Sequence, residues 1–293
     1  MDIFTILDLS TTNLINKYLI DFPPIISEHT FTNLFAWSES RPVWICEING
    51  GLIFLIKTDL CRNDEMVIFG PPLGNLPLSE VFKKLGNNII GGIRLTKNEI
   101  DSLENESLII NPDRDNSDYV YMTNNLADLA SRKYAKKRSH IRHCLDNYNC
   151  VYEHISENNI NECRELLQRW CQIRECDLDP GLCGESQALH MTLNHFTDFS
   201  LFGGAIRIDD QIQAFSIGER LNQNTAVCHF EKAMPEINGL NQLINHWFAQ
   251  NCLSEFEFVN REQDLGIPGL RQAKESYHPN HLLEKFTVFR TSP

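Results

Sequence analysis

The chain contains 293 residues, of which 42% are hydrophobic and 22% are charged, and its formal net charge is −13. This length is sufficient for two domains, each with its own core. So acidic a protein repels nucleic acid and anionic membranes as a whole, and only a local basic surface would bind either of them. The most apolar stretch, residues 43–56, is interrupted by polar residues and is too short to span a bilayer. The N-terminal residues lack a basic start before an apolar run, so we expect a cytoplasmic protein without an integral membrane segment.

The ten cysteines are scattered, and no two of them form a CxxC pair. Cys171, Cys176, Cys183 and His190 lie near one another in the sequence, but their spacing matches no common zinc motif. We therefore predict no metal site and expect reduced thiols that pack as small hydrophobic side chains.

The first third of the chain predicts a mixture of helices and strands. Asn49, Gly50 and Gly51 separate two β-rich runs at 43–48 and 52–57, which is typical of a β-hairpin. The other elements predicted here are a helix end at 31–37, strands at 66–70 and 89–95, a helix at 79–85 and a polar loop at 103–117.

From residue 124 onward, the order of elements favours a sheet packed by helices. Residues 124–148 carry apolar side chains at nearly helical spacing and predict one long helix, capped by Thr123 or Asn124. An alternation of helices and strands predicts an α+β fold, that is, a mixed α/β arrangement. The further elements are helices at 160–173, 185–196, 240–252 and 269–276, and strands at 203–208, 213–219, 225–233, 255–259 and 283–289.

The second half also contains a series of short motifs in a fixed order. They are Tyr119-Val120-Tyr121, Arg132-Lys133-Tyr134-Ala135-Lys136-Lys137-Arg138, Phe215-Ser216-Ile217-Gly218-Glu219, His229-Phe230-Glu231-Lys232-Ala233, Asn260-Arg261-Glu262, Asp264-Leu265-Gly266-Ile267-Pro268-Gly269-Leu270-Arg271 and Ala273-Lys274-Glu275-Ser276-Tyr277-His278-Pro279.

Together these motifs resemble the family named after the C-terminal domain of phosphatidylglycerol lysyltransferase, whose members have the GNAT acyltransferase fold. The first half resembles it through the hairpin and through Phe69-Gly70-Pro71-Pro72-Leu73-Gly74. The resemblance implies two tandem GNAT-like acyltransferase lobes with a cleft between them, each a mixed, mostly antiparallel sheet packed by helices. It implies an N-terminal lobe at 1–118 and a C-terminal lobe at 119–293, which would hold the donor.

A GNAT enzyme binds its donor at the loop and helix after the central strand, here predicted at 225–233. Enzymes that use CoA generally carry a Gln/Arg-x-x-Gly-x-Gly/Ala loop there. This chain has Glu236-Ile237-Asn238-Gly239-Leu240-Asn241 instead, with one glycine and one carboxylate. Because a pyrophosphate is bound by bare backbone amides, this departure weighs against acetyl-CoA, although Asn241 remains a candidate donor-binding residue.

A basic segment supplies another candidate anion site. Six basic residues and no carboxylate lie between positions 132 and 142. Such a segment could hold phosphates of tRNA, CoA or a lipid head group, or it could be a solvated helix surface neutralised by acidic neighbours. Its candidate donor-binding residues are Arg132, Lys133, Lys137 and Arg138.

Acyl transfer requires groups that accept and return a proton. Glu231 on the central strand is the candidate base, with Glu219 as an alternative, and a simple ion pair with Lys232 or an arginine is the structural alternative. The resemblance implies that Tyr277 protonates the leaving group. Arg261, Arg271 and Lys274 could fix an acidic group on the ligand, or the segment could be a structural turn.

The resemblance and the candidate residues allow three functions. The first is transfer of an aminoacyl group from aminoacyl-tRNA to an amine or hydroxyl acceptor, which would be a small molecule, a peptide or a lipid head group. The second is an acyl-CoA-dependent N-acyltransferase, and the third is a non-catalytic ligand-binding module on the same fold. In each enzymatic case the co-substrate is aminoacyl-tRNA or acyl-CoA, and no permanently bound cofactor is expected.

Overall fold

The computed structural model describes residues 4–103 and 108–291, which form two compact units. Unit 1 comprises the described residues within 1–119, 262–274 and 281–293, and unit 2 comprises 120–261 and 275–280. The first boundary lies next to the one expected from the sequence. The end of the chain is divided differently, because its last strand pairs with strands of the first half.

The sheet of unit 1 has seven strands in the order β1-β2-β3-β4-β5-β14-β6. The pairing of β4 with β5 is parallel, and the others are antiparallel. The strands are β1 (Thr5–Ile6), β2 (Val43–Ile48), β3 (Gly51–Ile56), β4 (Met66–Phe69), β5 (Ile89–Leu95), β6 (Leu108–Pro112) and β14 (Phe286–Arg290).

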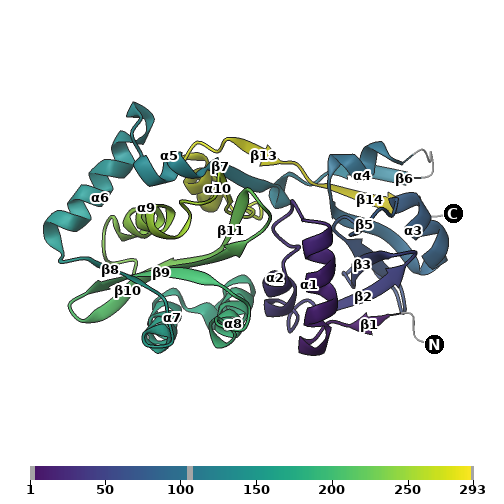
Figure 1. Cartoon of the computed structure of the whole chain (residues 1–293), viewed down its shortest axis with the longest axis horizontal. Coiled ribbons are helices and arrows are strands. Elements are labelled where there is room, and N and C mark those ends of the chain that lie inside the picture. The colour runs from purple at the N-terminus through teal and green to yellow at the C-terminus, as the bar shows by residue number, and fades with distance from the viewer. Residues whose placement is uncertain (1–3, 104–107, 292–293) are drawn as a thin grey trace. The chain divides into compact units, whose positions relative to one another are not determined.

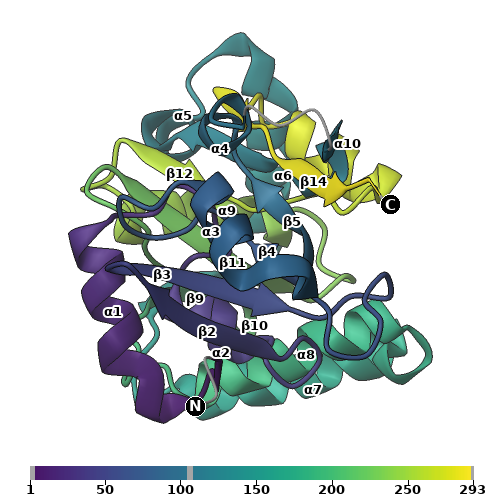
Figure 2. The same ribbon diagram turned by 90° about the vertical axis from the view of Figure 1, so that its right-hand side faces the viewer.

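Helices cover both faces of the central strands of unit 1, so that all six residues of β3 are buried. Figure 2 shows helix α3 (Leu78–Leu85) lying over one face of the sheet, and its buried residues Leu78, Val81 and Phe82 belong to the same hydrophobic cluster as Leu55 of β3. On the other face, the ring of His29 lies 4.9 Å from that of Phe54. The remaining helices of this part of the chain are α1 (Thr12–Asp21), α2 (Phe31–Ala36) and α4 (Lys97–Asp101).

A second sheet of seven strands runs in the order β13-β7-β12-β11-β10-β9-β8. Its strands are β7 (Asp118–Met122), β8 (Val151–His154), β9 (Phe202–Ile208), β10 (Gln211–Arg220), β11 (Thr225–Ala233), β12 (Phe258–Asn260) and β13 (His281–Leu283). The helices of the second half are α5 (Thr123–Asp128), α6 (Ala135–Asn147), α7 (Ile160–Arg174), α8 (Pro180–Asn194), α9 (Leu240–Cys252) and α10 (Pro268–Glu275).

The two faces of this second sheet are covered by different helices. Figure 1 shows α7 and α8 on one side of β9 and β10, with α9 on the other. Side chains of β11 follow this division because successive residues of a strand point to opposite faces. Lys232 contacts Trp170 of α7 and Glu185 of α8, whereas Glu231 contacts Asn245 of α9.

The two sheets share one topology, which confirms the predicted fold class of two tandem GNAT-like folds. In each, an antiparallel run leads into a parallel strand pair, β4 with β5 and β11 with β12, joined by one helix, α3 or α9. The sequence shows no repeat by identity. The repeat is therefore one of strand order and helix placement.

Three local predictions were wrong. The single helix expected at 124–148 is broken, because Leu129 adopts a left-handed conformation (φ +48°) and ends α5 before α6 begins. The single strand expected at 283–289 is two strands, separated by Glu284 and the buried Lys285. Of the polar loop expected at 103–117, residues 104–107 lie outside the described residues, and Leu108–Pro112 form β6 because they pair with β14.

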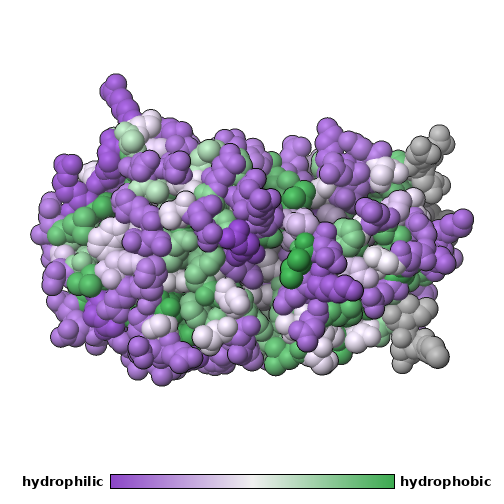
Figure 3. All heavy atoms as spheres, viewed as in Figure 1, coloured by the Kyte–Doolittle hydropathy of each residue, from purple (hydrophilic) through white to green (hydrophobic). Residues whose placement is uncertain are grey.

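Among the residues that the structure describes, no helix is both long and apolar enough to cross a bilayer. On the face seen in Figure 3, hydrophilic residues predominate and apolar residues form separate small groups.

Candidate functional site

The candidate site of unit 2 begins where the pairing of β11 with β12 ends. Their parallel pairing ends at Val227 and Asn260. A β-bulge between β10 and β11 follows. Ile217 pairs with Phe230 and Gly218 with Cys228, so that His229 is an extra residue of β11. Such a bulge increases the local twist of the strands. Glu231 follows this irregularity, so its carboxylate lies beyond the paired part of the two parallel strands.

Three polar side chains of unit 2 surround the carboxylate of Glu231. Arg261, which follows β12, places a guanidinium nitrogen 3.2 Å from one oxygen. Asn245 of α9 donates its amide N–H to the other oxygen at 3.1 Å, and the Ser216 hydroxyl lies 3.4 Å away. The ion pair that the sequence left open as an alternative is therefore formed with an arginine, and Lys232 points to the opposite face.

The orientation of Asn245 leaves a hydrogen-bond acceptor beside Glu231. Its amide nitrogen must face the carboxylate, because two oxygens there would repel each other. Its carbonyl oxygen is then buried without a hydrogen-bond partner among the described residues. A buried polar atom of this kind requires an explanation, and a ligand N–H is one.

The alternative carboxylate, Glu219, lies in a different environment. It pairs with the buried His229, whose Nε2 lies 2.8 Å from the carboxylate. Glu219 and Ser216 are three positions apart on β10, so their side chains point to opposite faces of the sheet. Glu219 is therefore not part of the site around Glu231.

The guanidinium of Arg261 also lies near the rings of two buried tyrosines. Its guanidinium lies 5.7 Å from the ring centre of Tyr121 and 5.1 Å from that of Tyr277. Burial acts to lower the pKa of Arg261, but the charge of Glu231 and the neighbouring tyrosines raise it above its ordinary value. Arg261 therefore stays charged and compensates the carboxylate.

Tyr277 is buried, and burial raises its pKa well above the usual value, although the charge of Arg261 opposes this rise. Its phenol therefore stays protonated and can donate a hydrogen bond. Its backbone is held by the Tyr134 hydroxyl, which donates to the Tyr277 carbonyl oxygen at 3.2 Å.

Lys137 of α6 contacts Tyr277 and its neighbour Ser276. Its ammonium lies 2.6 Å from the Ser276 hydroxyl and 3.8 Å from the ring centre of Tyr277. Burial, followed by the nearby charge of Arg261, lowers the pKa of Lys137 to about 8, although Glu231 opposes this shift. The sequence analysis predicted that Lys137 binds phosphates. It did not predict that Lys137 contacts Tyr277.

The other basic residues of the segment have different environments. Arg132, Lys133, Lys136 and Arg142 are exposed. Arg138 instead donates to the backbone carbonyl oxygens of Leu129 and Ser131, where the chain turns between α5 and α6. The exposed residues thus form the accessible basic surface of this segment, and Arg138 closes the turn.

Two of the predicted anion-binding residues, Arg271 and Lys274, belong to unit 1. Arg271 donates to the buried Asp264 at 2.8 Å and to Asp115 at 2.7 Å. Burial opposes ionisation of Asp264, but hydrogen bonds from Arg271 and Tyr119 hold its pKa well below the usual range. Lys274 lies 5.9 Å from the ring centre of Tyr119.

The loop before α9 brings Gly239 against α6. Gly239 has φ +90°, and a Cβ atom added there would collide with the backbone oxygen of His140. The predicted donor residue Asn241 is exposed in the first turn of α9. Helix α6 therefore packs against the beginning of α9, where a GNAT fold presents its backbone amides.

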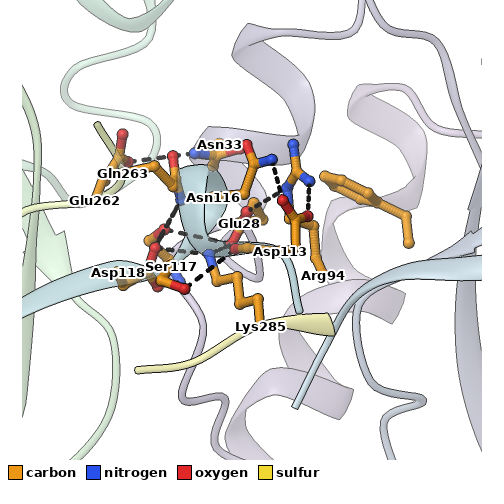
Figure 4. A network of polar contacts seen from close by, with 12 residues as sticks. Glu28, Asn33, Arg94, Asp113, Asn116, Ser117, Asp118, Glu262, Gln263 and Lys285 are labelled. Carbon is orange, nitrogen blue, oxygen red and sulfur yellow. Dashed lines mark hydrogen bonds and ion pairs between the residues drawn. The ribbon is translucent and has the colours of Figure 1, made fainter. Parts of the chain in front are cut away.

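A buried ionic network in unit 1 was not predicted from the sequence (Figure 4). The Lys285 ammonium lies 2.6 Å from both Glu28 and Asp118, and Arg94 pairs with Glu28 and Asp113 at 3.2 and 2.6 Å. Burial raises the pKa of Glu28, whereas Lys285 and Arg94 act in the opposite direction. Through these ion pairs, Lys285, which directly precedes β14, is connected to Glu28 and Asp118 in the first 119 residues. Because the charges compensate one another, we assign the network a structural role.

Comparison with known structures shows similarity along the whole chain. A conserved protein of unknown function from Bacteroides thetaiotaomicron is 29% identical, with a TM-score of 0.89 over 99% of this chain and 100% of that one. The C-terminal domain of a putative lysylphosphatidylglycerol synthetase from Agrobacterium fabrum has a TM-score of 0.69 at 11% identity, covering 97% and 92% of the two chains. FemX has a TM-score of 0.62 at 7% identity, covering 98% and 97%. The similarity to the last two shows the fold alone.

A curated relative, an uncharacterised protein of Mycoplasmoides gallisepticum, is 23% identical over 175 residues. These residues are 59% of this chain and 56% of that protein, so the match spans little more than half of the relative's length. The family described as phosphatidylglycerol lysyltransferase, C-terminal, matches residues 22–289. The chain therefore belongs to the family of phosphatidylglycerol lysyltransferase C-terminal domains, a family of GNAT-like transferases.

Proposed function

We propose that unit 2 transfers an aminoacyl group from aminoacyl-tRNA to an amine or hydroxyl acceptor. The observation that carries this proposal is the group of Glu231, Asn245 and Tyr277 beyond the paired part of β11 and β12. It combines a fixed carboxylate, a buried amide oxygen and a neutral phenol. Membership in a lysyltransferase family and the fold shared with FemX support an aminoacyl donor.

Each group has a role that suits its surroundings. The carboxylate of Glu231 and the carbonyl oxygen of Asn245 would accept hydrogen bonds from the acceptor amine or hydroxyl and orient it for attack. The phenol of Tyr277 would give its proton to the ribose oxygen that leaves. Arg261 keeps the carboxylate in place, and the exposed basic residues of α6 and the turn before it would contact tRNA phosphates.

An acyl-CoA donor is the second candidate, since α9 follows β11 as the donor-binding helix does in GNAT folds. Glu236 in the preceding loop and the contact of Gly239 with α6 weigh against a pyrophosphate at this position. A rise in melting temperature with acetyl-CoA or longer acyl-CoAs, and none with charged tRNA, would favour this candidate.

The proposal is tested by incubating the full chain with pools of charged tRNA and analysing the deacylated tRNA and the acylated products by mass spectrometry. Glu231→Gln and Tyr277→Phe should each lower the transfer rate about a hundredfold, as loss of a proton-handling or orienting group does. Lys84→Ala, an exposed change in unit 1, is the control. Transfer that is equally fast in all of these proteins would contradict the assigned site, and stable binding of a ligand without turnover would favour a non-catalytic module.

A further inference from the structure

Lys137 differs from its basic neighbours in what its amine touches. Lys133 and Lys136 are exposed on the same segment, whereas the Lys137 amine lies against Ser276 and the ring of Tyr277. Lys137 is half-buried, and its amine is turned towards Ser276 and Tyr277. This arrangement places an amine beside the phenol that the proposed reaction uses.

We propose that Lys137 is the proton acceptor of the transfer reaction, an inference that rests on the proposed function of unit 2. The neutral amine of Lys137 takes a proton from the acceptor amine or hydroxyl as that group forms its bond to the acyl carbon. The ester bond to the tRNA ribose breaks, and Tyr277 gives its proton to the departing oxygen. The resulting ammonium of Lys137 returns a proton to Tyr277, so that no proton is gained or lost in the cycle.

The surroundings of Glu231 make it the less suitable base. One of its oxygens pairs with Arg261, and the other accepts hydrogen bonds from Asn245 and Ser216. A carboxylate held by three donors is suited to orienting a substrate. The neutral amine of Lys137 has a free lone pair and can both accept and return a proton.

Burial and the charged groups around Lys137 together determine the pH at which its amine is neutral. Arg261 and Lys136 disfavour its charged form, Glu231 favours it, and the phenol of Tyr277 stays protonated. Burial, followed by the positive charges of Arg261 and Lys136, lowers the pKa of Lys137 to about 8, and Glu231 opposes this shift. A general base is most effective when its pKa is near the working pH, so an appreciable fraction of Lys137 is ready to accept a proton.

The first test measures Lys137 without any substrate. The lysines of the full chain are reductively methylated with ¹³C-formaldehyde, and the methyl resonances are followed by NMR as the pH is raised. The resonance that disappears in Lys137→Arg should titrate near pH 8, well below the ordinary lysine value of about 10.4. In Glu231→Gln the midpoint for Lys137 should fall further, because the carboxylate raises it. A midpoint for Lys137 near 10 would overturn the proposal.

The second test is the pH dependence of transfer, corrected for spontaneous hydrolysis of the ester. In the wild type, kcat/KM should rise about tenfold per pH unit up to about pH 8 and then level off. Lys137→Arg, which stays charged, should lower kcat about a hundredfold, leave the KM for tRNA within twofold and abolish the inflection near pH 8. Lys84→Arg should reproduce the wild-type profile.

The outcomes separate the two proposals. If the wild type transfers an aminoacyl group and Lys137→Arg keeps the same profile, the role of Lys137 is overturned and the function stands. If the wild type transfers nothing from any charged tRNA, both are overturned, whatever the titration shows.

Discussion

At the scale of single residues, burial decides what each ionisable group can do. His29 is a clear case in unit 1. It is fully enclosed, its Nε2 lies 3.0 Å from the carbonyl oxygen of Phe69, and burial lowers its pKa to about 4. In the unfolded chain the same ring takes up a proton near pH 6.5.

This difference predicts acid sensitivity of unit 1. Below about pH 6.5 the unfolded chain binds a proton that folded His29 does not, so stability falls until about pH 4, in total by about 3 kcal/mol. Hydrogen exchange followed by peptide mass spectrometry at pH 7 and pH 5, with rates corrected for pH, would measure the loss. His29→Gln keeps a hydrogen-bonding side chain without titrating, and its unit 1 should lose less stability over the same interval. An equal loss in the variant would assign the effect to other groups.

At the scale of elements, the basic residues of α6 and of the turn before it lie in three different environments. The exposed group of Arg132, Lys133, Lys136 and Arg142 faces solvent, Arg138 closes the turn after α5, and Lys137 joins the cluster around Tyr277. A helix turns by 100° per residue, so consecutive basic residues necessarily point in different directions. The sequence motif is continuous, but the helix separates its side chains.

Charge reversal tests the exposed group. Arg132→Glu, Lys133→Glu and Lys136→Glu combined should weaken tRNA binding strongly and make the remaining affinity less dependent on salt, because fewer counterions are released. Lys83→Glu and Lys84→Glu on α3 change the charge in the same direction and serve as the control. Filter binding at several salt concentrations gives the slope, and an unchanged slope in the triple variant would exclude this surface.

The contact between α6 and α9 depends on the absence of a side chain at Gly239. Gly239→Ala should destabilise unit 2 by about 1–3 kcal/mol, because both the positive φ and the contact with the His140 carbonyl oppose a Cβ atom. Gly50→Ala is a matched control, since Gly50 has φ +81° and open space around it. Urea unfolding should show a larger loss for Gly239→Ala. Equal losses would mean that the helix contact adds nothing.

At the scale of the whole molecule, unit 1 is completed only by the end of the chain. Strand β14 lies between β5 and β6, and the preceding residue, Lys285, pairs with Glu28 and Asp118. Contacts between segments so far apart in the sequence carry a cost in loop-closure entropy. Unit 1 therefore needs the C-terminal residues, although most of it is encoded in the first 119 positions.

Removing the central cation of this network should unfold unit 1 selectively. Lys285→Met leaves the carboxylates of Glu28 and Asp118 buried and without that partner, which typically costs about 3–5 kcal/mol. Peptides from unit 1 should lose hydrogen-exchange protection, while those from 135–252 should change little. Lys83→Met, at an exposed position, is the control, and full protection of unit 1 in Lys285→Met would contradict the proposed structural role.

The sequence alone predicted many elements of the fold, including β11 and α9 with their full bounds and the hairpin of β2 and β3. These depend on local signals, namely apolar periodicity and turn residues, which are present within a few positions. The breaks at Leu129 and before Lys285 were missed because burial and long-range pairing caused them. In the candidate site, Glu231, Arg261 and Tyr277 were predicted and come together, whereas Asn245 and the ionic network of unit 1 were not predicted.

The family, the tandem fold class and a set of chemically suitable side chains in the second half could thus be predicted from the amino-acid sequence. Which of these side chains meet depends on the folding of distant segments onto one another. Glu231 is bound by residues 14 and 30 positions away, and Lys137 contacts Ser276, 139 positions away. Burial and the charges of such distant neighbours determine the protonation of Lys137 and Tyr277, and neither quantity is present in the local sequence.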